Sequence, residues 1–574
     1  MIKLADCYRQ TGNSVKAELW YAQVVKLREA LPIHKFYYAE ALMENGKYPE
    51  AKRMFASYLE IMKSDDRAKR LMNSCDSVVV FYSDTTQYAI SLLPFNTSGT
   101  NNFSPVYYRS GIVFVSDRGA TGKSKVKSNY TGKEYLDLFY VKKTELGNWL
   151  EPEMLRGNIN GAFNEGPATF TFDYNIIYFT RNDYTGTNVN KNRRSFNNLK
   201  IFKGSFVGGE WNITSDLPFN NPEYSTAHPA LSKSGNTLYF ISDMPWGYGG
   251  TDIYSVKFIN GRWTNPQNMG AAINSPGNEL FPFVQFDSVL YFASDGNFGL
   301  GGLDIFQTLF NDNQWSTPYN LGYPVNSSRD DFGLIIDTLN REGYFTSKRY
   351  GGVDKIFSFL KYPATITLSG KITDSENKRN LAKVRIYVSA DGSKGEESFS
   401  DSTGQFKCSL SPNKKYQIII QKDGYFYYAS AVSTIGLFRS ASLNFPVALE
   451  KIKAGKIYRF YEVSFDKGET SFNSTSLPVL DSLVNWMKVN PKIKIEIGCH
   501  TDSRGSDKEN LTLTQKRAEA LADYFSINKI HPRRINSVGY GESKLLNGCV
   551  NGILCLDEDH AVNVRTEIKI TGIE

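Results

Sequence analysis

The sequence predicts a multidomain protein in which all-α helical hairpins are followed by an all-β propeller, a β-sandwich and a C-terminal α/β domain. Its 574 residues exceed what one hydrophobic core supports, and about three to five domains are expected. Two internal repeats, one of short and one of long period, occupy different parts of the chain. The 46 Gly, 35 Tyr and 37 Phe residues indicate many strands joined by tight turns.

Residues 1–75 carry a repeat of 34 residues, whose matched positions hold small or aromatic side chains. The matched pairs are Ala5 and Ala39, Gly12 and Gly46, Ala17 and Ala51, and Tyr21 and Phe55. Small residues let helices approach closely, and a Gly suits the turn between them. The pattern resembles tetratricopeptide repeats and predicts about two helical hairpins, which need a further surface to pack against. A plain pair of helical hairpins is the alternative.

Residues 76–362 carry a longer repeat, in which an apolar strand ends in a Ser-Asp or related pair. The copies are VFVSDRG (113–119), YFTRND (178–183), YFISDM (239–244), YFASDG (291–296) and YFTSKR (344–349). Ser242, Ser294 and Ser347 are separated by 52 and 53 residues, and units of this length without a helical pattern are typical of propeller blades. The motifs resemble the WD40-like PD40 repeats of TolB-type propellers.

The five motif copies predict a propeller of five blades. The strand-forming segment at 78–82 (VVVFY) would either close the ring or build a sixth blade. We interpret the aspartates of these motifs as turn-forming residues, because an Asp carboxylate often accepts hydrogen bonds from backbone amides in a tight turn.

Residues 365–449 contain short alternating strands separated by Gly and Asp turns, which predicts a small β-sandwich. The strands lie in TLSGKITD (367–374), AKVRIYV (382–388), DSTGQFKCSL (401–410) and KYQIIIQKDGY (415–425). The segment resembles the carboxypeptidase regulatory-like domain, a structural module of exported proteins that is not itself an enzyme. Residues 450–456 are expected to be a linker.

The most informative local pattern is IGCHTDSRGSDKENLTLTQKR at 497–517. Alternating apolar residues at 493–497 predict a strand, which leads into a loop that carries Asp502. A helix follows and presents Arg517, 15 residues after Asp502. A carboxylate and a guanidinium on neighbouring elements would hold a ligand with both an ammonium and a carboxylate, such as the end of a diaminopimelate side chain. A solvated surface ion pair is the alternative.

Residues 457–574 resemble the OmpA-like peptidoglycan-binding domain, which has an α/β fold. The resemblance rests on FDKGETSF (465–472), GCHTDSRG (498–505), NLTLTQKRAEAL (510–521), SVGYGES (537–543) and NVRTEIKI (563–570). It implies that Asp502 and Arg517 hold the diaminopimelate of a peptidoglycan stem peptide. The further contacts that it implies come from Asp466, Thr501, Asn510 and Arg565.

The chain departs from this family's pattern at two places. Arg504 stands where a small polar residue is usual, two places after the key aspartate. The family often has two arginines after the asparagine that is Asn563 here, and this chain has Val564 followed by Arg565. The central carboxylate and guanidinium are retained, so the resemblance still implies the same ligand.

Two of the six cysteines, Cys549 and Cys555, bracket a short loop. A local disulfide between them is predicted for an oxidising compartment, and similar pairs occur in some relatives of the OmpA-like domain. A zinc site that uses both cysteines with His560 is the rival, although it offers three ligands where structural zinc takes four. No cofactor is predicted.

Charge and hydropathy argue against two functional classes. The net charge of +7, from 66 basic and 59 acidic residues, is mild for this length, and no basic stripe indicates a nucleic-acid partner. No stretch reaches about 18 apolar residues, so a membrane helix is not expected. No signal peptide is visible at Met1, and we expect the natural chain to begin further upstream, where an export signal and a lipid anchor would fit.

The sequence carries no recognisable catalytic motif. The whole chain contains five histidines, and neither H-E-x-x-H nor G-x-S-x-G occurs. We interpret His500, which lies near Asp502, as a residue that supports the loop. We therefore expect a protein without enzymatic activity.

The order of the predicted domains resembles the outer-membrane-associated, peptidoglycan-binding subunit of the type IX secretion machinery. The resemblance implies a periplasmic scaffold that tethers an outer-membrane complex to the cell wall. Other secretion-system or outer-membrane proteins would then dock on the helical repeats and the propeller. In one alternative the propeller is the working part, as in TolB-like proteins, and wall binding only positions it. In another, the propeller is a hydrolase.

Overall fold

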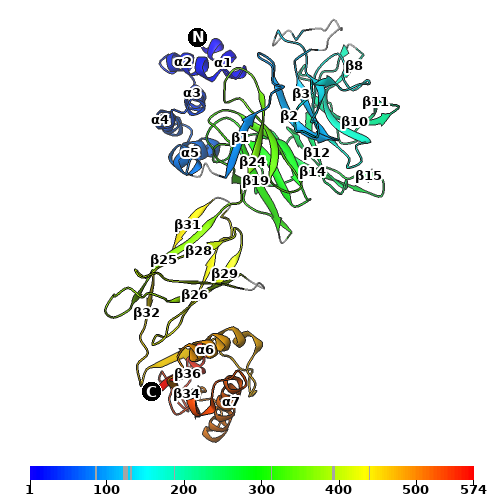
Figure 1. The fold of residues 1–574 in the computed structure, drawn as a ribbon. Helices are drawn as coiled ribbons and strands as arrows, with labels where there is room; N and C mark the ends of the chain where they lie inside the picture. The colour runs from blue at the N-terminus through cyan, green and yellow to red at the C-terminus, as the bar shows by residue number, and fades with distance from the viewer. Residues whose placement is uncertain are drawn as a thin grey trace. The chain divides into compact units, whose positions relative to one another are not determined.

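The structure is a computed structural model that describes residues 1–83, 87–119, 127–128, 132–186, 188–311, 313–390, 395–437 and 440–573. The chain divides into two compact units, Met1–Pro363 and Ala364–Glu574 (Figure 1). Both units are rich in β-strand, and helices are found in the first part of the first unit and the last part of the second.

Five helices open the first unit, and each contacts the next along the chain. They are α1 (Ile2–Gln10), α2 (Ser14–Val24), α3 (Pro32–Glu44), α4 (Tyr48–Leu59) and α5 (Asp66–Phe81). Residues that the 34-residue repeat matches occupy equivalent positions in the helices and turns. The four repeat alanines are buried in helix contacts. Gly12 and Gly46 have φ of 65° and 75° in the turns after α1 and α3, a conformation that glycine adopts without strain.

The helices extend further than the sequence predicted. Residues 78–81, expected to form a strand, are the last turn of α5, and the domain boundary expected at residue 75 falls inside this helix. Asp65 caps α5 by accepting the Ala68 N–H (2.9 Å), and buried residues such as Leu71 pack the helix against its neighbours. Capping and packing thus outweigh the strand preference of the valines, two of which are exposed.

Residues 88–361 form five antiparallel sheets of four or five strands. The first has β2 (Asn102–Tyr108), β3 (Gly111–Ser116), β4 (Asp137–Lys142) and β5 (Glu153–Met154); the second has β6 (Glu165–Phe170), β7 (Ile176–Asn182), β10 (Leu199–Val207) and β11 (Glu210–Asp216). The third has β12 (Thr226–Leu231), β13 (Thr237–Ser242), β14 (Asp252–Ile259), β15 (Arg262–Trp263) and β16 (Gln267–Asn268). The fourth has β17 (Glu279–Gln285), β18 (Val289–Ser294), β19 (Asp304–Asn311), β20 (Gln314–Trp315) and β21 (Tyr319–Asn320).

The fifth sheet joins the two ends of this region. It contains β22 (Asp331–Ile336), β23 (Glu342–Ser347), β24 (Lys355–Lys361) and β1 (Tyr88–Leu92), which comes from the start of the region and pairs with β24. The strand that completes the sheet is therefore β1 and not the segment 78–82. A small separate hairpin is formed by β8 (Tyr184–Thr185) and β9 (Asn188–Val189).

The first strands of the five sheets, β2, β6, β12, β17 and β22, contact one another in this order, and β22 contacts β2. Each of these strands pairs with the second strand of its own sheet, and all five pairings contain the same irregularity, a β-bulge in the middle of the first strand. The five strands surround a cavity of only about 30 Å³. Aromatic rings occupy this centre, where Phe281 stacks on His228 (centroids 4.1 Å apart) and on Phe332 (4.4 Å).

Several aspartates in and after the sheet motifs accept hydrogen bonds from backbone amides, whereas Asp183 pairs with the side chains of Asn190 and Lys200. Asp295 accepts the Asn278 N–H (2.7 Å), and Asp304 accepts the Leu300 N–H (2.6 Å). The amide that Asp295 accepts lies 17 residues earlier, so this carboxylate joins two loops, whereas Asp304 accepts an amide four residues earlier and closes a tight turn.

The helices pack against loops of the sheets within the first unit. Arg67 of α5 forms ion pairs with Glu40 of α3 (2.8 Å) and with Asp295 after β18 (3.2 Å), and Ser328 donates to the Glu44 carbonyl (2.9 Å). A polar cavity of about 810 Å³ lies between these helices and the loops. The helical hairpins therefore have the packing partner that two repeats alone require.

Two four-stranded sheets open the second unit and share one hydrophobic core. One contains β25 (Ile366–Asp374), β28 (Gln405–Leu410), β31 (Ala441–Asn444) and β32 (Val447–Leu449). The other contains β26 (Arg385–Ala390), β27 (Glu396–Phe399), β29 (Lys415–Gln421) and β30 (Tyr428–Ser433). This is the layered arrangement that the alternating strands predicted.

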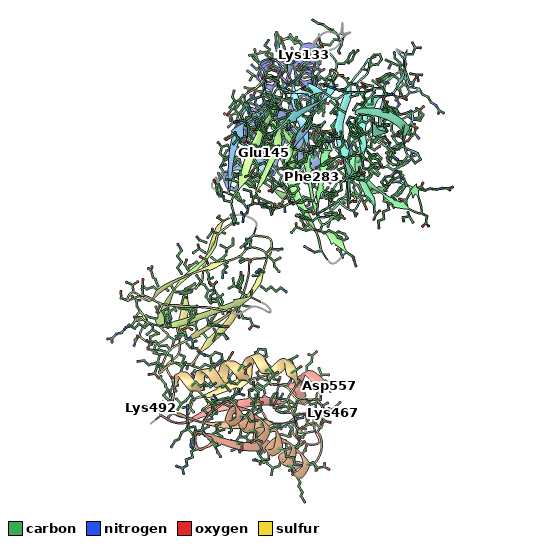
Figure 2. All side chains as sticks on the ribbon, turned by 45° about the vertical axis from the view of Figure 1, so that its right-hand side comes forward. Lys133, Glu145, Phe283, Lys467, Lys492 and Asp557 are labelled. Carbon is green, nitrogen blue, oxygen red and sulfur yellow. A yellow bond between two sulfur atoms is a disulfide. The ribbon has the colours of Figure 1, made fainter. Side chains whose placement is uncertain are left out.

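The C-terminal domain is a four-stranded sheet with helices. The strand order is β33 (Ile457–Phe460), β36 (Arg565–Ile573), β34 (Ile493–His500) and β35 (Ile535–Gly541), with β34 and β35 parallel. Its helices are η1 (Ser474–Ser476), α6 (Leu477–Val489), α7 (Asp507–Ile527), η2 (Pro532–Arg534) and α8 (Asp557–Ala561). Lys492 and Asp557 lie at opposite ends of the domain (Figure 2).

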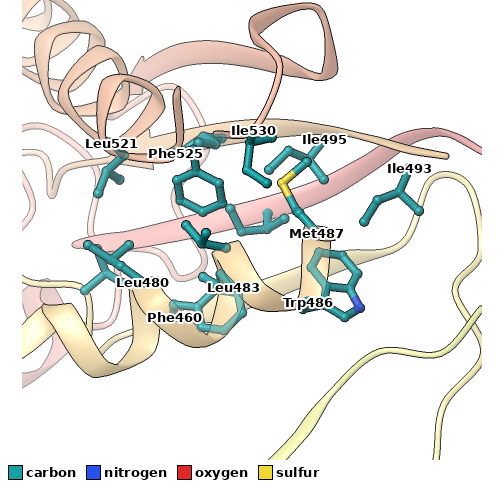
Figure 3. Close-up of a cluster of buried hydrophobic side chains, with 14 of the residues drawn as sticks. Phe460, Leu480, Leu483, Trp486, Met487, Ile493, Ile495, Leu521, Phe525 and Ile530 are labelled. Carbon is teal, nitrogen blue, oxygen red and sulfur yellow. The ribbon is translucent and has the colours of Figure 1, made fainter. Parts of the chain in front are cut away.

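The core of this domain lies between α6, α7 and the sheet (Figure 3). Residues of α6 such as Leu480 and Met487 meet Phe525 of α7 and Ile495 of β34. The apolar faces of α6 and α7 are buried here except in the first turns, where Leu477 and Leu511 are exposed.

The segment expected to be a linker, 450–456, is hydrogen-bonded to the structure on both sides. The Glu450 carbonyl accepts the Phe426 N–H (2.8 Å), and the Lys456 carbonyl accepts the Ile570 N–H (2.9 Å). The segment connects the sandwich, whose last strand ends at Leu449, to the C-terminal domain, whose first strand begins at Ile457, and backbone hydrogen bonds hold both of its ends.

Candidate functional site

Asp502 lies two residues after β34, in the loop between this strand and α7, with a side chain only 10% exposed. Its Oδ2 atom accepts hydrogen bonds from Nε (3.0 Å) and Nη2 (2.6 Å) of Arg504, and its Oδ1 atom accepts the Arg504 backbone N–H (2.9 Å). Burial raises the pKa of Asp502, but the contacts with Arg504 outweigh burial and hold this pKa below its ordinary value. Asp502 is therefore a buried, ionised carboxylate.

Arg517 lies on the buried face of α7 and is held by the loop that contains Asp466. Its Nε donates to the Glu469 carbonyl (2.8 Å), its Nη2 donates to the Asp466 carbonyl (3.0 Å), and its guanidinium lies 4.7 Å from the Phe465 ring centroid. Burial lowers the pKa of Arg517, which stays charged at neutral pH. Nη1 has no acceptor among the described residues, so both of its N–H groups remain available.

Asp502 and Arg517 are not joined by an ion pair or hydrogen bond in the described part of the chain. Hydrogen bonds connect their neighbours: the Thr501 N–H donates to the Gly541 carbonyl (3.0 Å), and the Gly541 N–H donates to Thr514 (2.9 Å), three residues before Arg517 on α7. The two charges thus belong to the same end of β34. The alternative of a solvated surface pair is wrong, because both side chains are largely buried and each has other partners.

The loop with Asp502 is fixed by the start of α7. Ser506 caps the helix by accepting the Glu509 N–H (3.2 Å). The Asn510 side-chain amide donates to the Arg504 carbonyl (3.2 Å) and to Glu542 (2.6 Å). Asn510, expected as a ligand contact, therefore uses its amide group to hold the loop.

Thr501 and Asp466 occupy different places in the site. The Thr501 hydroxyl is buried and has no hydrogen-bond partner among the described residues, and the residue is 7% exposed. A buried hydroxyl without a partner costs free energy, and a polar ligand would satisfy it. Asp466 contributes its backbone carbonyl to Arg517, while its carboxylate accepts a long hydrogen bond from Asn473 (3.3 Å).

Arg565 is engaged within the protein. Nε donates to Glu567 (2.8 Å), Nη1 to the Asn563 carbonyl (3.0 Å) and Nη2 to the Lys544 carbonyl (3.0 Å), and the side chain is 2% exposed. This geometry gives Arg565 a structural position instead of the ligand contact that the resemblance implied.

A disulfide borders the site. Cys549 and Cys555 are bonded, and the Cys549 carbonyl accepts a hydrogen bond from the Ser503 hydroxyl (2.6 Å). The bonded sulfurs are not free thiolates, which removes the rival zinc site. No cluster of metal-binding side chains occurs among the described residues, and no helix there has the length and apolar character needed to cross a membrane.

Sequence reasoning missed what Arg504 does. Its identity was recognised as unusual, but its contact with Asp502 and a second one from Nη1 to Asp557 (2.7 Å) were not anticipated. The signal was the spacing of two residues between Asp502 and Arg504 in a loop, where a long side chain folds back on its neighbour. The contact with Asp557 had no sequence signal, because 53 residues separate the partners.

Residues 464–552 match the model of the OmpA family. The peptidoglycan-associated lipoprotein of Buchnera aphidicola is 31% identical over 139 residues, which cover 24% of this chain and 76% of that protein. Outer membrane protein P5 of Haemophilus influenzae is 23% identical over 293 residues, 44% of this chain and 79% of that protein. The crystal structure of the peptidoglycan-associated lipoprotein from Burkholderia pseudomallei aligns at 27% identity over 19% of this chain and 87% of that chain, with a TM-score of 0.17. Through its C-terminal domain, this chain belongs to the OmpA family.

Proposed function

We propose that the C-terminal domain binds peptidoglycan by holding the zwitterionic end of a diaminopimelate side chain. The observation that carries this proposal is the pair of opposite charges at the end of β34, Asp502 and Arg517, which are both buried and do not neutralise each other. The Buchnera relative, named as peptidoglycan-associated, supports the same ligand.

Each group of the site has a role in this proposal. Asp502 accepts hydrogen bonds from the ligand ammonium, and the free Nη1 of Arg517 donates to the ligand carboxylate. The backbone carbonyls at 466 and 469 hold the guanidinium in place beforehand, so less conformational entropy is lost on binding. The Thr501 hydroxyl gains the partner that it lacks.

We extend this proposal to the whole chain as a non-enzymatic scaffold in the periplasm, associated with the outer membrane, that ties a protein complex to the cell wall. A wall polymer presents many stem peptides, so a site of modest affinity holds a large assembly through effective concentration. The order of helical hairpins, repeated sheets, sandwich and OmpA-family domain supports assignment to the type IX secretion machinery. In this assignment the hairpins are tetratricopeptide repeats and the five sheets are propeller blades that bind partner proteins.

The polar cavity of the first unit favours a second candidate function. At about 810 Å³ it is large enough for a segment of a partner protein, and it is lined by both helices and sheet loops. In this alternative the five-sheet region is a TolB-like interaction module, and wall binding only positions it. Deleting the sheets while Asp502 and Arg517 remain intact would then abolish the biological role without affecting wall binding.

The test of wall binding is sedimentation of the full chain with purified peptidoglycan that contains diaminopimelate. The unchanged protein is expected in the pellet, and Asp502→Asn is expected in the supernatant because the ligand ammonium loses its counter-charge. Asp523→Asn removes the same charge from an exposed position on α7 and serves as the matched control. Sedimentation of Asp502→Asn at the level of this control would contradict the proposal.

A further inference from the structure

The Asp502 carboxylate, which the proposed function assigns to the ligand ammonium, is already paired with a cation of the protein itself, Arg504. Arg504 reaches Oδ2 of Asp502 with two nitrogen atoms, at 3.0 and 2.6 Å, while its backbone N–H bonds Oδ1. Oδ2, the oxygen to which we assign the ligand ammonium, thus has both lone pairs engaged before any ligand arrives, while Oδ1 accepts one bond. A ligand ammonium reaches Oδ2 with good geometry only if the Arg504 side chain moves away.

The surroundings of the Arg504 side chain allow it to move away from Asp502. Its side chain is 56% exposed, whereas that of Asp502 is 10% exposed. Nη1 of Arg504 also bonds Asp557 (2.7 Å), a fully solvated residue at the start of α8. The guanidinium therefore keeps a partner and regains hydration when it leaves Asp502, while Asp502 needs another cation because its carboxylate is buried.

A second observation indicates that a ligand belongs beside this carboxylate. The Thr501 hydroxyl, one residue before Asp502, is buried with no hydrogen-bond partner among the described residues. Arg504 leaves this hydroxyl unsatisfied. A ligand ammonium has three N–H donors and satisfies the carboxylate and a neighbouring hydroxyl together, which the planar guanidinium does not do here.

We propose that Arg504 is a specificity-determining residue, an internal counter-ion that occupies the ammonium position of Asp502 and must be displaced by the ligand. It keeps the buried carboxylate paired in the unoccupied site. It also selects for ligands whose amine is charged, because a neutral group at this position does not replace the guanidinium. This inference rests on the proposed function and adds the residue that opposes binding.

The predicted consequence is a gain of affinity when Arg504 is removed. Arg504→Ser keeps the backbone N–H that bonds Oδ1 and deletes the competing guanidinium. Because an ion pair with one exposed partner is weak, affinity for the charged amine is expected to rise about three- to five-fold. Removing Arg504 gives no such gain for a ligand without an ammonium.

The experiment is calorimetric titration of the full chain with two peptides. The first is the tripeptide L-Ala–γ-D-Glu–meso-diaminopimelate, and the second is the same peptide with its side-chain amine acetylated. Arg504→Ser is compared with Arg533→Ser, which removes an exposed arginine next to Arg534, whose Nε bonds the Ile493 carbonyl at the opposite end of β34. The unchanged chain and Asp502→Asn complete the set.

Tighter binding of the free-amine peptide by Arg504→Ser, with no gain in Arg533→Ser or with the acetylated peptide, supports the inference. Equal or weaker binding by Arg504→Ser overturns it, and so does an equal gain with both peptides. If the unchanged chain binds and Asp502→Asn does not, wall binding stands whatever Arg504→Ser shows. If neither the unchanged chain nor Arg504→Ser binds the free-amine peptide, the proposed function and this inference both fall.

Discussion

At the residue scale, two arginines of the C-terminal domain differ in whether their donors are all engaged within the protein. Arg565 donates from all three nitrogen atoms to protein acceptors, and its side chain is 2% exposed. Arg517 is nearly as buried, but its Nη1 has no acceptor among the described residues. Position in a family motif predicted both as ligand contacts, and only the geometry of their donors distinguishes them.

Arg565→Ala is expected to destabilise the C-terminal domain, and it is not expected to weaken ligand binding directly. Removal of the guanidinium takes one charged hydrogen bond from Glu567 and leaves the half-exposed Arg459 (3.1 Å) as its arginine partner, which is expected to cost about 1.5–3 kcal/mol. Urea denaturation followed by tryptophan fluorescence measures the loss, with Arg533→Ala as an exposed control. Unchanged stability together with lost peptidoglycan binding would make Arg565 a ligand contact after all.

His500 gives a pH dependence of known sign. Burial lowers its pKa to about 4, the positive charge of Arg565 acts in the same direction, and Glu567 opposes both. The unfolded chain binds the proton near the ordinary pKa of about 6.5, so between these values it holds more protons than the folded state. The contribution of His500 to stability is therefore lost as the pH falls from about 6.5 towards 4.

Proton NMR of the histidine C2–H signals tests this expectation. His500, assigned by comparison with His500→Gln, is expected to titrate near pH 4, and the variant is expected to unfold less steeply with acid. Titration of His500 near pH 6.5 would mean that the ring is hydrated and not packed against Tyr540, as the stacked rings require (centroids 4.9 Å apart).

At the element scale, the sequence predicted the strands and helices whose apolar or small residues recur with a regular period. Alternating isoleucines gave β34, and the 34-residue repeat gave α1 to α4 with glycines at the turns. The end of α5 was missed because its valines favour a strand. The N-cap and the buried residues in the earlier turns of α5 stabilise the helix, which continues through these valines. The bonded segment 450–456 and the contact of Arg504 with Asp557 depend on distant partners, so local sequence carries no signal for them.

The disulfide between Cys549 and Cys555 is expected to stabilise the loop that borders the site. Closing a short loop lowers the entropy of the unfolded chain and contributes about 2 kcal/mol. The double variant Cys549→Ser/Cys555→Ser should unfold at lower urea concentration than the oxidised protein. Addition of dithiothreitol should shift the unchanged protein in the same way and leave the variant unaffected. Identical midpoints for oxidised and reduced protein would mean that the loop is held by its hydrogen bonds alone.

At the scale of the whole molecule, each unit combines a helical part with a sheet-rich part. In the first unit Arg67 connects the two, since it pairs with Glu40 of α3 and with Asp295 in the sheets. The helical repeat is too short to be independently stable, which explains why its surface is packed against sheet loops. In the second unit the sandwich and the OmpA-family domain are joined by the bonded segment 450–456.

Arg67→Met is expected to loosen the helices from the sheets of the first unit. The substitution leaves two partly buried carboxylates without their shared cation, and the loss of such charged hydrogen bonds is estimated at about 2 kcal/mol. Limited proteolysis should then cut within residues 1–83 faster than in the unchanged chain. Lys69→Met removes an exposed positive charge from the same helix and is the control. Equal cleavage rates in both variants would show that apolar packing alone holds the helices.

The central claim, that Arg517 binds the ligand carboxylate, is tested most directly by a thermodynamic cycle between protein and ligand. Affinities of the unchanged chain and of Arg517→Lys are measured for two stem tripeptides, one ending in meso-diaminopimelate and one ending in lysine, which lacks the side-chain carboxylate. For the unchanged chain, loss of the ligand carboxylate is expected to weaken binding at least about tenfold. For Arg517→Lys, the two peptides are expected to bind with similar, weak affinity, because the forked donor is gone. If the diaminopimelate peptide kept the same advantage in both proteins, Arg517 would not be the group that recognises the carboxylate.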